Sequence, residues 1–539
     1  ESMSKVRFGS AAAVVVALAL GSLGCGATNE ADKAAAGGTL VIALPSQPEN
    51  LNPIYGDNIY EGNQKSFNGL LRYDHDLNAE PDLAASMPTR SADGKTVTVK
   101  LRDDVKFSDG TPFRAKDVAF TYNAIIAPKT ASPMATLLDS LVSAKAVDDA
   151  TVEFALNRAD PAFYDKLQVG ILPEHLLAGK DLKNASFNRK PVGTGPYVVT
   201  EFQPGGRIVE EANPNYFRGP PKIKRLVLTA VEDENARVAL LEKGTIDAVG
   251  VLPKLAPRVR RNKDYNVFEV ITADARVAAL PNRDPVLKDP AVRRALSYGV
   301  DRQKIVAGAL AGVGEPAYGP LQKGHPDYSP VLERPFDPAK AQSMLHAAGW
   351  KRQGSDTRTK DAKKLSFLLM YPAGDAVRKD IALAFSSQMA DIGVDVRLQG
   401  LSFDVIQTRQ DKGATEFGYG VPYDPDMELY TLYDSKFADE PGDVTDTAFT
   451  NYPRMRSAMV DAALKAERST LDPAARKRAF ADMQAGLADD GSWLYLVRLR
   501  HIVAVSKRVH GVDPQVEPHA HGFSRGTSWN IEDWTLDAQ

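Results

Sequence analysis

The stretch Lys100-Leu-Arg-Asp-Asp-Val-Lys-Phe-Ser-Asp-Gly-Thr-Pro112 joins several local patterns in a short piece of chain. Leading into it, apolar and polar residues alternate over positions 97–101, which predicts a half-exposed strand. Within it, Ser-Asp-Gly at positions 108–110 predicts a turn. A helical pattern then begins at Asp117 and continues to Tyr122. The segment therefore predicts strand, turn and helix in succession.

Further strands and helices are predicted elsewhere in the chain. Short apolar runs at positions 39–44 and 225–231 predict buried strands. Helices are predicted where a capping aspartate precedes a proline at the first helical position, which occurs at Asp289-Pro290, Asp337-Pro338 and Asp472-Pro473. Gly349 is expected to end the second of these helices. Strands and helices are mixed along the chain, so we expect α/β or α+β layers and not a helical bundle.

The overall composition is that of a soluble globular protein. The chain has 539 residues, of which 43% are hydrophobic and 25% charged, and its formal net charge is −3. At about 100–200 residues per domain, this length predicts about three units or two large lobes. The charge balance gives no reason to expect nucleic-acid binding. The single cysteine, Cys25, excludes an internal disulfide, a four-cysteine zinc site and a CxxC redox pair.

Residues 1–24 are predicted to be a secretory signal peptide. Lys5 and Arg7 precede an apolar run at positions 11–20, which is shorter than the about 20 residues that a membrane-spanning helix needs. Cys25 follows small residues directly after this run, as in a bacterial lipoprotein signal. We therefore expect cleavage before Cys25, lipidation of that residue and a tether over residues 25–38. The alternative is an ordinary secretory signal with an incidental cysteine.

The catalytic and metal-binding motifs in the sequence are incomplete. Gly522-Phe-Ser-Arg-Gly526 matches the GxSxG nucleophile pattern, but no histidine follows Ser524 to activate it. Asp74-His-Asp76 resembles the start of a calcium loop, but alanine stands where that loop needs its glycine and its bidentate glutamate. His519 and His521 could share one face of a strand, yet a metal site needs further ligands. We expect no enzymatic activity, no metal site and no cofactor.

A series of longer motifs runs through most of the chain. Besides the stretch at 100–112, it comprises Phe67-Asn-Gly-Leu-Leu71, Pro81-Asp-Leu-Ala84, Ala115-Lys-Asp-Val118, Pro191-Val-Gly-Thr-Gly-Pro-Tyr197, Asn213-Pro-Asn-Tyr216, Leu240-Leu-Glu-Lys-Gly-Thr-Ile-Asp247 and Val292-Arg-Arg-Ala-Leu-Ser-Tyr298. Together these motifs resemble family 5 of the extracytoplasmic solute-binding proteins, which serve peptide and nickel ABC importers. The resemblance spans roughly residues 39–505.

The resemblance implies an α/β fold of the type II periplasmic-binding-protein class. Such a fold has two lobes, an extra subdomain on the first lobe and two hinge crossings. The segments 268–281 and 493–506 are the candidate crossings. We expect the first lobe to comprise residues 39–270 and 503–539, with the subdomain at about 72–190, and the second lobe to comprise residues 271–502.

The resemblance also locates the cleft loop of the second lobe, at Gly418-Tyr-Gly-Val-Pro-Tyr-Asp-Pro-Asp426. Peptide-binding members carry an aspartate three residues before the Asp-Pro aspartate, where it clamps the peptide ammonium group; here that position is Val421. Asp424 or Asp426 could substitute for the clamp, or Asp424-Pro425 could simply form the turn. Nickel-binding members have a tryptophan and a tyrosine at the positions of Tyr419 and Tyr423.

Other positions of the nickel-site pattern are only partly matched. Tyr55 matches an aromatic residue and Tyr60 a methionine, but Phe437 stands where a histidine can reach the metal, and Ala131 and Lys166 fall nearest to its arginines. Phe523 and His519 are further candidates, near the end of the chain where it is expected to return to the cleft as part of the first lobe. The expected ligand-binding residues are Tyr55, Tyr60, Tyr419, Tyr423, Asp424 and Phe523. For the tyrosines, the alternative is packing in the core or at the rim.

The expected function is that of a lipid-anchored substrate-binding protein of an ABC importer. Such a protein captures a peptide or peptide-like solute between closing lobes and delivers it to permease subunits that work with cytoplasmic ATPases. We expect a monomer at the outer, periplasmic face of the bacterial cytoplasmic membrane. One alternative with the same fold binds a nickel chelate or another small solute. An alternative of another class is a scaffold or regulatory lipoprotein that has lost transport.

Overall fold

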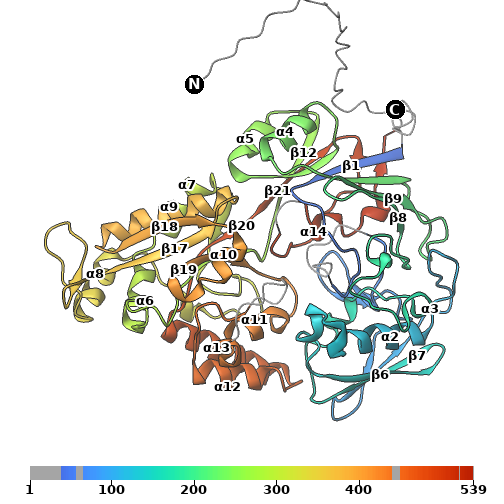
Figure 1. Cartoon of the computed structure of the whole chain (residues 1–539), viewed down its shortest axis with the longest axis horizontal. Coiled ribbons are helices and arrows are strands. Elements are labelled where there is room, and N and C mark those ends of the chain that lie inside the picture. The colour runs from blue at the N-terminus through green and yellow to red at the C-terminus, as the bar shows by residue number, and fades with distance from the viewer. Residues whose placement is uncertain (1–37, 56–64, 440–449, 521–522, 538–539) are drawn as a thin grey trace, which may run out of the picture.

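The computed structural model describes residues 38–55, 65–439, 450–520 and 523–537. The predicted signal peptide and Cys25 lie outside these residues, as does all of the predicted tether except Gly38. The described chain forms two lobes, each built on its own mixed sheet (Figure 1). We call the lobe on the seven-stranded sheet the first lobe and the lobe on the six-stranded sheet the second lobe. This arrangement agrees with the expected two-lobed α/β fold.

The sheet of the first lobe combines strands from both ends of the chain. Its order is β12-β21-β11-β1-β10-β9-β8. In chain order these strands are β1 (Thr39–Leu44), β8 (Tyr197–Phe202), β9 (Arg207–Ala212), β10 (Arg225–Ala230), β11 (Ala248–Val251), β12 (Tyr265–Val270) and β21 (His501–Ser506). β1 and β10 confirm the two buried strands predicted at 39–44 and 225–231. Helices α4 (Glu234–Glu242) and α5 (Ala256–Arg260) lie next to β11 and β12.

The first lobe also carries a four-stranded sheet of order β4-β5-β7-β6. Its strands are β4 (Thr89–Arg90), β5 (Thr96–Lys100), β6 (Leu141–Asp148) and β7 (Thr151–Leu156). Helix α2 (Ala115–Ile126) packs on this sheet, and short elements complete the lobe: β2 (Leu71–Tyr73), β3 (Ala79–Pro81), α3 (Glu174–Leu177), α14 (Arg525–Ser528), β22 (Val509–His510) and β23 (Thr535–Leu536).

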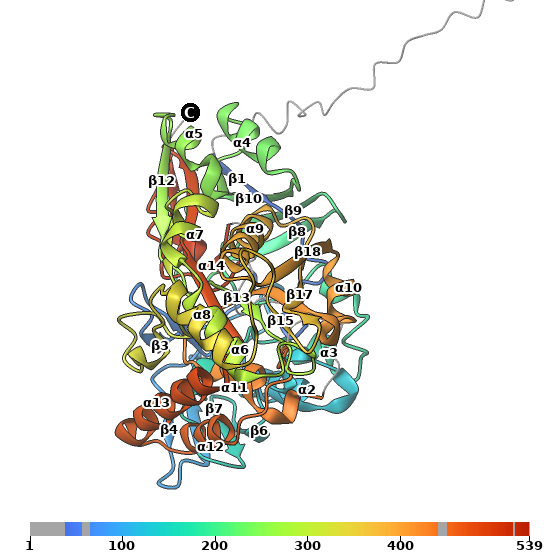
Figure 2. The ribbon, with the colours of Figure 1, turned by 90° about the vertical axis from the view of Figure 1, so that its left-hand side faces the viewer.

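The second lobe contains a six-stranded sheet of order β14-β20-β13-β19-β17-β18. Its strands are β13 (Ala275–Ala279), β14 (Gly314–Pro316), β17 (Ser366–Pro372), β18 (Asp395–Leu401), β19 (Ala414–Tyr419) and β20 (Trp493–Leu499). Beside it runs the small hairpin of β15 (Thr359–Lys360) and β16 (Lys363–Lys364). Four helices pack beside one another over the six-stranded sheet (Figure 2): α6 (Pro290–Tyr298), α7 (Arg302–Ala309), α8 (Pro338–Ala347) and α9 (Ala376–Asp391).

The remaining helices of the second lobe lie towards the first lobe or below the sheet (Figure 1). They are α10 (Phe403–Gln407), α11 (Asp426–Tyr433), α12 (Ala458–Glu467) and α13 (Pro473–Asp490). The chain changes sheet between β12 and β13 and again between β20 and β21, within the two segments predicted as crossings. We propose that the lobe boundaries lie at these two points. In the part of the chain that the structure describes, no helix has the length and apolarity to span a membrane.

The three helices predicted from Asp-Pro pairs are confirmed as α6, α8 and α13. Each aspartate caps its helix by accepting backbone N–H groups, as Asp289 does from Ala291 at 2.9 Å. The predicted start of α2 at Asp117 was too late, because the helix begins at Ala115. Asp117 is the third helical residue, and its carboxylate accepts the Arg114 N–H at 2.9 Å in a capping box.

Candidate functional site

The two lobes touch each other at the loop that follows β19. Tyr73, at the end of β2 in the first lobe, stacks on Tyr423 of this loop, with 4.7 Å between ring centroids and 6° between ring planes. The Tyr73 hydroxyl donates to the Asp165 carboxylate, whose second oxygen accepts the Asp424 backbone N–H at 2.9 Å. Burial and the Asp424 carboxylate raise the pKa of Asp165 to about 6. The loop is therefore docked on the first lobe by an aromatic stack and hydrogen bonds.

The side chain of Asp424, a predicted ligand-binding residue, is engaged within its own lobe. Arg476 on α13 donates to both Asp424 oxygens, at 2.5 and 2.8 Å. The same guanidinium donates to the buried Glu467 carboxylate at 2.9 Å. Asp424 thus positions the loop through a bidentate ion pair, and a ligand cation would have to compete with Arg476 for it.

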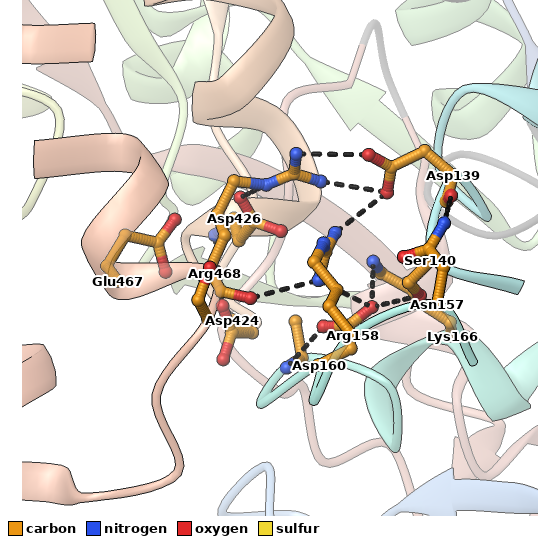
Figure 3. A network of polar contacts seen from close by, with 12 residues as sticks. Asp139, Ser140, Asn157, Arg158, Asp160, Lys166, Asp424, Asp426, Glu467 and Arg468 are labelled. Atoms are coloured by element: carbon orange, nitrogen blue, oxygen red, sulfur yellow. Dashed lines mark hydrogen bonds and ion pairs between the residues drawn. The ribbon is translucent and has the colours of Figure 1, made fainter. Parts of the chain in front are cut away.

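A network of ion pairs joins the lobes at the end of α12 (Figure 3). Arg468 donates to both carboxylate oxygens of Asp139 in the first lobe, at 2.9 and 3.1 Å. It also donates to the buried Asp426 of its own lobe at 2.7 Å. Arg158 of the first lobe also contacts the second lobe, because it donates to the Arg468 carbonyl at 2.9 Å. It donates to Asp139 of its own lobe at 2.9 Å as well. The contact therefore involves charged groups from both lobes.

Behind this contact, the first lobe supplies a second, fully buried pair. Lys166 donates to Asp160 at 2.7 Å, and the Ser140 hydroxyl donates to the same carboxylate at 2.6 Å. Burial opposes the ionisation of Asp160, but Lys166 and Arg158 outweigh it and lower the pKa of Asp160 to about 2. Lys166, which the sequence pattern placed near a nickel-site arginine, thus serves as an internal counter-ion.

Tyr419 lies in the core of the second lobe, although the sequence predicts a position facing a ligand. Its side chain is only 1% exposed. Its hydroxyl exchanges hydrogen bonds with those of Tyr433, at 2.6 Å, and Tyr495. Its ring meets Trp493 edge-on with 5.6 Å between centroids. Tyr419 and Tyr423 therefore belong to different environments, one in the core and one between the lobes.

Two other predicted aromatic residues, Tyr55 and Phe523, have contacts within the first lobe. Tyr55 donates its hydroxyl to the Thr130 carbonyl at 2.7 Å, and burial raises its pKa to about 12. Phe523 packs edge-on against Trp534 in the core of the first lobe, with 6.4 Å between centroids. Tyr60 lies outside the described residues. Of the predicted set, Tyr423 and Asp424 are the residues found at the contact between the lobes.

A buried ionic cluster ties together the segments that cross between the lobes. Asp274 contacts His519 at 2.7 Å and His501 at 3.0 Å, and it is paired with Arg276. His501 also contacts the Glu517 carboxylate. Burial alone would lower the pKa of His501, but the two carboxylates outweigh it and raise this pKa to about 9. The cluster joins both crossings to the C-terminal segment that carries Glu517 and His519.

Of the metal-ligand candidates in the sequence, His519 takes part in this cluster, and His521 lies outside the described residues. Across the described ranges of the chain, no group of three or more histidine, cysteine, aspartate or glutamate side chains is placed to hold a metal ion. Phe437, at the histidine position of the nickel pattern, is buried and packs edge-on against Tyr430, with 5.1 Å between ring centroids.

Several residues of the contact between the lobes were not predicted from the sequence. Tyr73 ends β2, Asp165 begins a short 3-10 helix and Arg468 directly follows α12, and none of them belongs to a recognisable motif. Asp165 and Asp424 are 259 residues apart in the sequence. The one available signal was the position of Tyr73, which is the second residue after the motif at 67–71.

Comparisons with known proteins identify the family and the fold of the chain. The family model for bacterial extracellular solute-binding proteins, family 5 Middle, matches residues 78–440. Protein XP55 of Streptomyces lividans is 37% identical over 94% of this chain and 92% of its own length. The structure of NikZ from Campylobacter jejuni in complex with Ni(L-His) is similar, with a TM-score of 0.84, 28% identity, and coverage of 93% of this chain and 99% of that one. AppA from Bacillus subtilis in complex with a nonapeptide gives a TM-score of 0.77, 27% identity and the same coverage.

Proposed function

Because the chain belongs to family 5 of the bacterial extracellular solute-binding proteins, we propose that it captures a peptide or peptide-like solute between its lobes for an ABC importer. The observation that supports the capture step is the docking of the loop at 420–426 on the first lobe. Its Tyr423 ring, 7% exposed, forms part of an aromatic wall between the lobes. Aromatic walls with a few fixed polar groups are typical of ligand pockets.

The ammonium group of a bound solute would not be held by a carboxylate of this loop. Val421 occupies the clamp position, while Arg476 holds Asp424 and Arg468 holds Asp426. Both carboxylates already have a cationic partner, so an incoming ammonium group gains little there. We therefore favour a peptide-like solute that is held mainly by groups other than the Asp424 and Asp426 carboxylates.

A nickel chelate is the second candidate. It is favoured by the higher TM-score with NikZ, 0.84 against 0.77 for AppA. Because no metal-holding group of side chains is found within the described part of the chain, the chelate would have to supply most of the metal ligands itself. The aromatic ring of Tyr423 would then pack on the chelator.

Native mass spectrometry of the protein purified from a related bacterium separates the two candidates. Adducts of several masses in the peptide range, sequenced after denaturation, would support the peptide proposal. A single adduct with a nickel isotope pattern would favour the chelate. If the protein carries neither, titrations with a peptide library and with nickel plus histidine decide, and the absence of any binding would refute solute capture.

We further propose that Cys25 carries a lipid that anchors the protein at the outer face of the cytoplasmic membrane. Stable attachment needs a diacyl or triacyl group, because one acyl chain binds a membrane only weakly. Metabolic labelling with an alkyne fatty acid tests this proposal. Labelling and membrane recovery should both be lost in Cys25→Ser, and labelling that persists in this variant would contradict it.

A further inference from the structure

The first lobe contains a polar cavity beside the contact with the second lobe. Its volume is about 110 Å³, well above the roughly 10–15 Å³ that one water molecule needs. The cavity is formed by the segment that leads into β2 and by the C-terminal segment around α14. Tyr73 lines it and also stacks on Tyr423. The cavity therefore lies directly behind the aromatic wall between the lobes.

The lining of this cavity carries a net positive charge. Its cations are Lys65, Arg72 and Arg525, and its acids are Asp82 and Glu532. Arg72 also pairs with Glu80 at 2.6 Å and Asp82 with Arg218 at 2.9 Å, and Glu80 and Arg218 lie outside the lining. The described residues that line the cavity thus include three cations and two acids.

A further carboxyl group lies close to this lining but adds little negative charge. Glu210 on β9 is completely buried near Lys65, and burial raises its pKa to about 8. It is therefore mostly protonated at neutral pH. Lys65 gives one hydrogen bond to the Trp529 carbonyl at 2.9 Å and lies 3.8 Å from Glu532, although an ammonium group has three N–H donors.

Arg525 connects the cavity with the contact between the lobes. It donates to the Gln168 side chain at 3.1 Å, and Gln168 donates to the Asp165 carbonyl at 3.1 Å. The positive charge of Arg525 also acts on Tyr73 and Tyr423, where it opposes the effect of burial on their pKa values. A group held by Arg525 would thus sit next to the residues that dock the loop.

We propose that this cavity is a subsite for a carboxylate of the captured solute, with Arg525 as the principal cation and Lys65 as the second. The proposal rests on the solute-capture function and specifies its chemistry. A guanidinium group matches the planar carboxylate with paired N–H donors. The acids Asp82 and Glu532 in the same lining disfavour a dianion such as phosphate, and a lining with three cations and two acids suits a single carboxylate.

Isothermal titration with matched pairs of probes tests this subsite. The peptide pair is trialanine and its C-terminal amide, and the non-peptide pair is glutarate and glutaramide. We expect the acid of a binding pair to bind at least tenfold more tightly than its amide. In Arg525→Gln the acid should lose at least tenfold in affinity, while the amide changes less than twofold. Arg258→Gln, an exposed arginine of the first lobe paired with Glu242, is the control and should behave as the wild type.

The outcomes distinguish the subsite from the wider function. Equal affinity for trialanine and its amide, or an acid preference that survives in Arg525→Gln, overturns the subsite and leaves peptide capture standing. Binding of glutarate without binding of trialanine supports the subsite and counts against a peptide as the solute. If neither acid binds, the proposal is wrong. Melting curves and circular dichroism of each variant exclude loss of fold as the cause.

Discussion

Replacing Asp139 by asparagine should release the second lobe from the first. Asp139 accepts two hydrogen bonds from Arg468 across the contact, at 2.9 and 3.1 Å. Arg468 keeps its bond to Asp426 and its position over the Tyr430 ring, with 3.5 Å from the guanidinium carbon to the ring centroid. The substitution therefore weakens the contact between the lobes without leaving a buried charge unpaired in the second lobe.

The expected magnitude follows from the exposure of the two side chains. Hydrogen bonds to charged groups contribute about 1.5–3 kcal/mol, whereas exposed ion pairs contribute about 0–1 kcal/mol. Arg468 is 8% exposed and Asp139 31% exposed, so the value should lie between these ranges, at about 1–2 kcal/mol. This corresponds to a change of roughly 5–30-fold in the ratio of open to closed forms.

Small-angle scattering and hydrogen exchange measure the effect. Asp139→Asn should have a larger radius of gyration than the wild type and faster amide exchange at residues 420–426. Asp104→Asn is the matched control, because Asp104 forms a similar two-bond pair with Arg102, at 2.9 and 2.6 Å, within the first lobe. Scattering and exchange that are the same in Asp139→Asn as in the wild type would refute the assignment of this pair to lobe closure.

Three further predictions concern the loop and the crossings. Tyr423→Ala should weaken solute binding by roughly 1–3 kcal/mol with little loss of fold, because its ring forms the wall between the lobes; an unchanged Kd in calorimetry removes it from the site. Gly420→Ala should destabilise the protein by more than about 2 kcal/mol, since Gly420 has φ 148° and a Cβ would lie 1.9 Å from the Ala273 carbonyl; urea unfolding at wild-type stability contradicts this. The pKa of His501 is raised to about 9, so its stabilising contribution is complete below about pH 6.5 and is lost as the pH rises through 9. Urea unfolding at pH 6, 7.5 and 9 should show this decline in the wild type and not in His501→Gln, and equal slopes would disprove the role of His501.

The sequence predicted local elements better than it predicted the site. The capped helices at Asp289, Asp337 and Asp472 depend on neighbouring residues alone, so their patterns are visible in the sequence. The contact of Arg468 with Asp139 joins positions 329 residues apart, and no local pattern reports it. The position of Tyr419 was not predictable either, because every residue of β19 is buried. A strand covered on both faces has no polar alternation to identify a ligand-facing side.

The placement of β21 constrains the order in which this protein can fold during synthesis. β21 lies between β11 and β12 in the seven-stranded sheet, yet it is formed by residues 501–506. Almost the entire polypeptide must therefore be synthesised before that sheet can be completed. The sheet of the second lobe has the same property, because its inner strand β20 is formed by residues 493–499, directly before β21. Each of the two large sheets therefore lacks an inner strand until late in translation, so neither lobe can complete its core before nearly all of the chain has been synthesised.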